Sequence, residues 1–89
     1  MRRVFFASRF EKKLRVFHSR HPELSTAVEA TIIAIAKDPH APALKTHRLH
    51  GHLSDCFASR LSREHRIVFA LEPNAAIFLD IGTHDAVYR

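Results

Sequence analysis

The chain has 89 residues, enough for one domain with a single modest hydrophobic core and too few for two. We therefore predict one domain over residues 1–89. Fourteen Lys and Arg residues outnumber nine Asp and Glu residues, which gives a formal charge of +5 before any of the eight histidines is protonated. This surplus favours a polyanionic partner, nucleic acid first and an acidic protein second.

A single cysteine, Cys56, cannot form an internal disulfide, and no apolar leader with a cleavage site opens the chain. We therefore expect a reducing, cytoplasmic location. The longest weakly polar stretch, residues 27–36, contains Glu29 and Thr31 and is far shorter than a membrane span, which needs about 20 apolar residues. The sequence predicts no membrane role.

The first half of the chain has the pattern of a short strand followed by a helix. Residues 3–6 read Arg-Val-Phe-Phe, which favours a strand, and Ser8 precedes Glu11 by three residues, as in a capping box that starts a helix. Apolar residues then recur at i, i+4 and i+7: Phe10, Leu14 and Phe17. The helix ends at His21, because the residue before a proline avoids the α region.

A second helix is predicted from Pro22 to the Asp38-Pro39 pair. Its apolar stripe consists of Leu24, Val28, Thr31, Ile32 and Ile35. The two helices form an αα-hairpin whose apolar faces need a third surface. A sheet must provide it.

Three strands are predicted in the second half, at residues 56–61, 66–71 and 76–81, joined by turn-forming connectors at residues 62–65 and 72–75. Short links favour an antiparallel meander. Alternation places six side chains on the face toward the helices: Ile67, Phe69, Leu71, Ile77, Leu79 and Ile81. The opposite face then carries Arg66, Val68 and Asp80. The predicted fold class is α+β, an N-terminal short strand and an αα-hairpin packed on an antiparallel β-sheet, with residues 39–46 as a loop.

Polar side chains stand at the strand ends of this half. Arg66 opens a strand directly after Glu64 and His65, and His84 and Tyr88 follow the last strand. A guanidinium offers a rigid fork of donors to a phosphate, and imidazoles titrate near neutral pH. The combination suggests a metal-free ribonuclease.

The order of elements and two motifs, residues 64–69 (Glu-His-Arg-Ile-Val-Phe) and 81–88 (Ile-Gly-Thr-His-Asp-Ala-Val-Tyr), resemble the RelE/ParE superfamily of bacterial type II toxins. The resemblance spans nearly the whole chain and is greatest to the YoeB and YafQ branches. It implies a RelE-like fold and an mRNA interferase that cuts codons in the ribosomal A site. The implied partners are a cognate antitoxin protein, mRNA in the A site and rRNA.

The family pattern can be carried over residue by residue. His47, 19 positions before Arg66, stands where similar toxins have a Glu or His that takes the proton from the ribose 2′-hydroxyl. Arg66 matches an arginine that stabilises the pentavalent phosphate. His84, 18 positions after Arg66, matches a histidine that protonates the 5′-oxygen, and Tyr88 matches an aromatic that stacks on or orients the nucleotide. Asp80 departs from the pattern, because some members have a basic residue near that position.

These residue types also fit the chemistry itself. Cleaving RNA through its own 2′-oxygen needs a base, an acid on the opposite side of the phosphorus, and fixed positive charge for the developing dianion. Two histidines and an arginine meet that need without a metal or other cofactor. The products would be a 2′,3′-cyclic phosphate and a 5′-hydroxyl. The pair His50 and His52 lacks a Cys or carboxylate set at ligand spacing, so we predict no metal site.

Five further residues are candidates for substrate binding: Lys45, Arg48, Arg60, Glu64 and His65. The three cations either form a solvated basic rim or contact the RNA backbone. Glu64 and His65 either form only a hairpin turn or line the active cleft.

Two functions from other classes remain open. The first is a ParE-like inhibitor of DNA gyrase, which shares the fold and acts by binding, although such toxins generally lack the His, Arg, His set present here. The second is a noncatalytic module whose basic face docks on an acidic antitoxin or on rRNA. Codon preference, oligomeric state and the need for a ribosome are not encoded in any recognisable pattern of the sequence.

Overall fold

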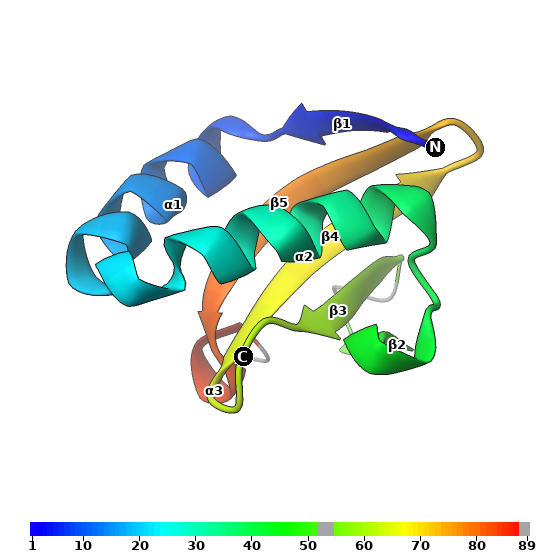
Figure 1. The fold of residues 1–89 in the computed structure, drawn as a ribbon. Helices are drawn as coiled ribbons and strands as arrows, with labels where there is room; N and C mark the ends of the chain where they lie inside the picture. Colours follow the sequence, from blue (N-terminus) through cyan, green and yellow to red (C-terminus); the bar gives the residue numbers. More distant parts are fainter. Residues whose placement is uncertain (52–54, 88–89) are drawn as a thin grey trace.

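A five-stranded sheet with two long helices forms the body of the protein (Figure 1). The structure is a computed structural model that describes residues 1–51 and 55–87. The elements in chain order are β1 (Arg3–Phe6), α1 (Ser8–Arg20), the 3-10 turn η1 (Pro22–Leu24), α2 (Ser25–Lys37), η2 (Pro42–Leu44), β2 (His47–Arg48), β3 (Cys56–Arg60), β4 (His65–Glu72), β5 (Ala75–Thr83) and α3 (His84–Val87). The predicted α+β class is confirmed.

The sheet is mixed, with the strand order β1-β5-β4-β3-β2. Strands β3 to β5 form the predicted antiparallel meander, and β2, which was not predicted, adds to it antiparallel to β3. In contrast, β1 pairs with β5 in parallel, from Arg3 opposite Ala75 to Phe6 opposite Phe78. A fully antiparallel sheet was therefore the wrong expectation. Parallel neighbours need a long crossover connection, and the segment between β1 and β5, which includes both long helices, supplies it.

The helical hairpin follows the predicted boundaries closely. Its stripe residues Phe10, Phe17, Val28 and Ile35 are buried. The capping box, however, is wrong: Ala7 is the N-cap residue of α1, no side chain caps the helix, and Ser8 already lies inside it. The carbonyl of Ala7 accepts the N–H of Glu11 at 3.1 Å, so the backbone alone starts the helix.

The main core lies between the helices and the sheet, and we call it the helix-side core. It contains Phe10, Phe17, Val28, Ile35, Leu44, Leu61, Ile67, Phe69, Ala76, Phe78 and Ile81. Phe78 is fully buried at its centre, with ring centroids 5.7 Å from Phe10 and 5.9 Å from Phe69. Aromatic pairs at these separations add to the stabilisation that burial gives.

A β-bulge in β5 changes which side chains face the helices. Val68 pairs with Asp80, but the next residue, Phe69, pairs with Phe78, so Leu79 is an extra residue in β5. Before the bulge, even-numbered residues face the helices, and after it Ile81 does. The predicted placement of Ile77 and Leu79 on the helix side is therefore wrong, because uniform alternation assumed no bulge.

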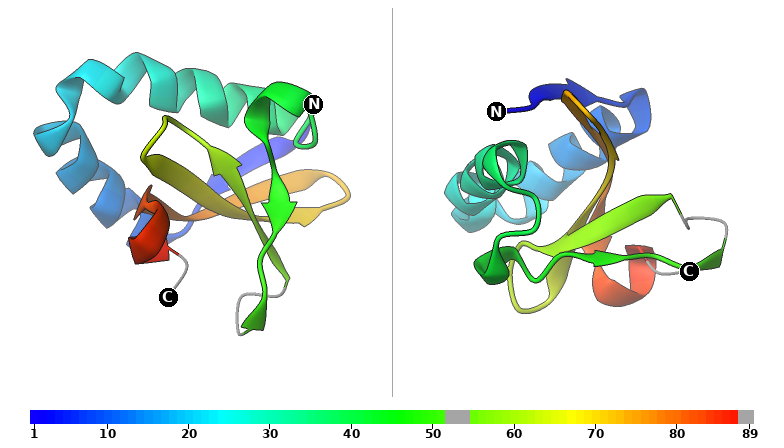
Figure 2. Two further views of the ribbon diagram at one scale, coloured as in Figure 1. Left: turned by 90° about the horizontal axis from the view of Figure 1, so that it is seen from below. Right: turned by 90° about the vertical axis from the view of Figure 1, so that its right-hand side faces the viewer.

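A smaller second core covers the opposite face of the sheet. It consists of Leu49, Ala58, Val68 and Val87, with Cys56 and Leu79 packed against it. Val87 belongs to α3, so this short helix lies on the side of the sheet away from α2 (Figure 2). The helices of the described residues are all too short or too polar to span a bilayer.

Candidate functional site

The face of the sheet that carries the second core also carries the basic residues predicted to act on a phosphate. Residues directly opposite each other in paired strands point to the same face, as do alternate residues along one strand. His47 pairs with Ala58, and Arg60 pairs with Arg66. Ala58 and Val68 belong to the second core, so His47, Arg60 and Arg66 share its face.

The spacing of His47 and Arg66 leaves room for a ligand between them. They lie two strands apart, and Arg66 is two residues further along the sheet, because Ala58 opposes His47 and Arg60 opposes Arg66. Strand geometry places their Cα atoms about 12 Å apart. Two long side chains at that separation can approach one phosphodiester group from different directions.

The guanidinium of Arg66 is held by the turn between β3 and β4. Its Nη1 atom donates to the carbonyl oxygens of Ser62 and His65 at 2.9 Å each and approaches that of Arg63 at 3.4 Å. These bonds fix the orientation of a half-buried cation. A guanidinium has five N–H donors, so Nη2 and Nε add three donors to those of Nη1.

His47 has a defined tautomer in this arrangement. Its Nδ1 atom lies 3.3 Å from the carbonyl oxygen of Lys45. A carbonyl oxygen can only accept, so Nδ1 carries the hydrogen and, in the neutral ring, Nε2 holds the lone pair. Lys45 has a left-handed backbone (φ 49°) at the end of η2, and this bend brings its carbonyl toward the ring two residues later. The tautomer is the one that an Nε2 general base needs.

His84 begins α3 next to the Arg66 turn. Thr83 pairs with His65 at the end of β5, and the backbone N–H of His84 donates to the carbonyl of Glu64 at 3.2 Å. The His84 side chain is 58% exposed, and its Nδ1 lies 3.5 Å from Asp85 Oδ1. The same turn therefore positions both Arg66 and His84 at one end of the sheet.

The remaining predicted site residues are not all on this face. Lys45 and Arg60 are exposed near it, whereas Arg48 points to the helix side, where its guanidinium lies 5.6 Å from the ring of Phe57. Glu64 is exposed in the turn. Tyr88 lies outside the described residues, and its role stays a prediction.

His65 faces the helices instead of the Arg66 face. It is 8% exposed, its Nδ1 lies 2.9 Å from Ser62 Oγ, and its ring packs edge-on to Phe17 and His21 at centroid distances of 5.1 and 4.8 Å. Burial, and secondarily the neighbouring His21, lower the pKa of His65 below its usual range. The neutral ring is thus part of the packing.

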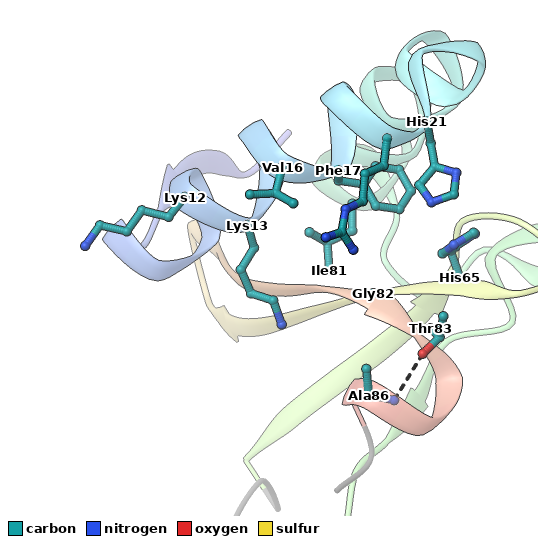
Figure 3. Close-up of a pocket in the computed structure, with 11 residues that line it drawn as sticks. Lys12, Lys13, Val16, Phe17, His21, His65, Ile81, Gly82, Thr83 and Ala86 are labelled. Atoms are coloured by element: carbon teal, nitrogen blue, oxygen red, sulfur yellow. Dashed lines mark hydrogen bonds between the residues drawn. The ribbon is translucent and has the colours of Figure 1, made fainter.

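A pocket opens beside His65, between α1 and the end of β5 (Figure 3). Its volume is about 490 Å³. The lining residues are Lys12, Lys13, Val16, Phe17, Arg20, His21, His65, Ile81, Gly82, Thr83 and Ala86. Sequence reasoning missed this pocket, although the cations at positions 12, 13 and 20 of one helix were a visible signal.

Asp80, the residue that departs from the family pattern, forms ion pairs with α1. Its carboxylate lies 2.5 Å from Lys13 Nζ and 3.7 Å from Arg9 Nη2. Its charge is thereby balanced by two cations, which weakens any repulsion of a nearby phosphate.

Other chemistry has little support in the described residues. Burial, then the charge of Asp55, raise the pKa of the Cys56 thiol, which disfavours the nucleophilic thiolate. Residues 1–51 and 55–87 contain no group of three or more His, Cys, Asp or Glu side chains placed to hold a metal ion. His52, half of the candidate metal pair, lies outside those ranges.

No protein-family model matches the sequence, and no characterised protein matches it at the level of sequence. Solved structures do match. YafQ from Escherichia coli superimposes with a TM-score of 0.85 at 15% identity, with both chains covered completely. A YoeB/ParE toxin from Agrobacterium tumefaciens gives 0.79 at 14% identity, over 92% of this chain and 98% of the other.

Complexes of such toxins also match. The DinJ-YafQ complex of Escherichia coli gives a TM-score of 0.83 at 15% identity, with full coverage of both chains. The YoeB-YefM complex of Staphylococcus aureus gives 0.76 at 15% identity, over 94% of this chain and 98% of the other. The RelE/ParE-like fold predicted from the motifs is confirmed over the whole chain.

Proposed function

We propose that this protein is the toxin of a type II toxin-antitoxin pair and acts as a ribosome-dependent mRNA endoribonuclease. The observation that carries the proposal is that His47 and Arg66 lie on one face of the sheet and that His84 begins α3 beside the turn that holds Arg66, in a chain whose fold matches that of YafQ. The +5 charge adds a general affinity for a polyanion.

In the proposed mechanism, Nε2 of neutral His47 takes the proton from the ribose 2′-hydroxyl, and the 2′-oxygen attacks the phosphorus. Arg66 stabilises the charge that develops on the phosphate oxygens, because its turn-anchored guanidinium needs no reorganisation. Protonated His84 gives its proton to the departing 5′-oxygen. The products are a 2′,3′-cyclic phosphate and a 5′-hydroxyl, and no metal or cofactor takes part. Tyr88 is proposed to stack on or orient the nucleotide.

Lys45 and Arg60 are proposed to contact the RNA backbone around this site, because both are exposed cations near its face. The proposed protein partner is a cognate antitoxin, by analogy with YafQ, which forms a complex with DinJ, and YoeB, which forms one with YefM. The proposed location is the cytoplasm, where ribosomes and mRNA are found.

Translation in a purified system, followed by mapping of mRNA 5′ ends, tests the proposal. Cuts in phase with codons, dependent on ribosomes, would support the interferase. DNA breaks that require gyrase, with intact mRNA, would instead assign the protein to the ParE-like inhibitors. If neither result is observed, the noncatalytic binding module is the remaining function.

His40→Ala provides a matched control for variants of the catalytic histidines. His40 is exposed, and its ring lies 5.4 Å from that of Phe57, whose side chain packs against the helix-side core. Loss of one imidazole at that position should leave cleavage unchanged.

A further inference from the structure

The pocket between α1 and β5 combines an apolar floor with a cationic rim. Val16 and Phe17 of α1 and Ile81 of β5 supply apolar surface, and Lys12 and Lys13 stand on the α1 side (Figure 3). Val16 is 53% exposed, unusual for a large apolar side chain beside a cavity. The volume of about 490 Å³ lies within the range of ligand-binding sites, about 300–1,000 Å³.

The charged side chains that line the pocket are all basic, although Asp80 and Glu23 lie beside two of the lining residues, Lys13 and His21. None of its lining residues is Asp or Glu. The helix α1 carries five Lys and Arg residues and one acid, Glu11, so it concentrates most of the excess positive charge of the chain. Lys13 is paired with Asp80, which leaves Lys12 and Arg20 as the rim cations with the most to gain from an anionic partner.

The floor distinguishes a peptide from a nucleic acid. Single-stranded RNA binds such basic grooves by stacking its bases on exposed aromatic faces. Phe17, the aromatic of the pocket, is only 7% exposed and is covered by the rings of His21 and His65. Ile81 is likewise buried, at 3% exposed, so Val16 is the exposed apolar side chain of the pocket, and the partly exposed ring of His21 is the main aromatic surface left for stacking. An exposed valine suits an apolar side chain of a protein segment better than a stacked base.

We propose that this pocket receives an acidic segment of the antitoxin, which places an apolar side chain against Val16 and carboxylates beside Lys12 and Arg20. The inference rests on the proposed toxin function, because it assigns that function's protein partner to a surface. His47 and Arg66 lie on the opposite face of the sheet, but the pocket borders α3 through Ala86, two residues after His84. The pocket would then be an anchor point for inhibition beside the proposed acid.

Binding of the product of the reading frame adjacent to this gene tests the pocket. Lys12→Glu/Arg20→Glu and, separately, Val16→Glu should each raise its Kd about tenfold or more, because charge reversal and a buried unpaired carboxylate both oppose docking. Arg15→Glu/Lys37→Glu, which also reverses two charges, and Ile33→Glu are the matched controls. These residues are exposed on α1 or α2 and do not line the pocket, so the control variants should change Kd by less than about threefold.

The other outcomes overturn the inference. Equal losses in the pocket and control variants would show that net charge, and not the pocket, governs binding. If the same pocket variants instead abolish binding of a single-stranded RNA oligonucleotide and leave antitoxin binding intact, the surface binds RNA. Absence of any complex with wild-type protein would also refute it.

Cleavage by the pocket variants separates this inference from the proposed function. In the purified translation system without antitoxin, they should cut mRNA within about threefold of wild type, since none belongs to the catalytic set. If the wild-type protein does not cut mRNA, the proposed function fails independently of the pocket.

Discussion

Replacement of Arg66 should have two separable effects, one on stability and one on cleavage. Nη1 of Arg66 donates to the carbonyls of Ser62 and His65 at 2.9 Å, with a weaker third contact to Arg63. A charged donor contributes about 1.5–3 kcal/mol per hydrogen bond, and partial exposure reduces this to about 1 kcal/mol for each of the two short bonds. Arg66→Ala should therefore lower the free energy of unfolding by about 2 kcal/mol.

For a domain of this size, that loss corresponds to a fall in Tm of about 8–16 °C. Arg66→Lys keeps the charge and can keep one carbonyl contact, so its Tm should fall by about half as much. Arg63→Ala is the matched control, because Arg63 is an exposed arginine of the same turn whose backbone carbonyl remains in place. Its Tm should stay close to that of wild type.

Cleavage is then measured well below the lowest Tm, in the purified translation system. Arg66→Ala should reduce the rate about 10²–10³-fold, and Arg66→Lys should reduce it less, because lysine supplies charge without the planar fork. A folded Arg66→Ala protein that cleaves at the wild-type rate would refute the transition-state role. An unchanged Tm would refute the anchoring role of the turn.

Three further predictions concern the catalytic histidines, the buried histidine and the bulge. His47→Ala and His84→Ala should each lower cleavage about 100-fold or more with Tm unchanged, because both side chains are exposed; an unfolded variant would contradict their assignment. The lowered pKa of His65 means that acid favours the unfolded chain below about pH 6.5, so wild-type Tm should fall more steeply than that of His65→Gln between about pH 7.5 and 5; equal slopes in thermal melts would refute this. Deletion of Leu79 removes the extra residue but keeps the Phe69–Phe78 and Val68–Asp80 pairs, so Ile81 stays on the helix side and the fold should lose only the packing of Leu79 on the second core, about 1–2 kcal/mol in urea titrations; a variant that does not fold would mean that the sheet requires the bulge.

The layers of the fold could be predicted because their signals are local. The Phe10, Leu14, Phe17 stripe and the Val28 and Ile35 stripe recur at helical spacing, and the structure buries them as expected, with Leu14 partly buried at the edge of the core. The two-residue strand β2 could not be predicted in the same way. His47 and Arg48 join the sheet only because they pair with Ala58 and Phe57, a contact that no local pattern encodes.

The candidate site shows the same division. The motifs identified Arg66 and His84, and the turn at residues 62–65 was predicted, but not the hydrogen bonds by which that turn holds both residues. Alternation correctly predicted that Arg66 and Val68 share the face away from the helices, but the burial of His65 against α1 was not predicted. His65 and Arg66 are adjacent in sequence, yet one packs on Phe17 and the other shares a face with Val68, because neighbouring strand residues point in opposite directions.

The single extra residue in β5 acts as a phase shift in a periodic signal. Before Leu79 and after it, side chains alternate between the two faces of the sheet with period two, but the second alternation is shifted by one residue relative to the first. Averaged across the whole strand, they partly cancel, so a search for one uniform alternation finds a weaker signal than either half contains. The same offset lets one strand supply Phe78 and Ile81 to one core and Leu79 to the other.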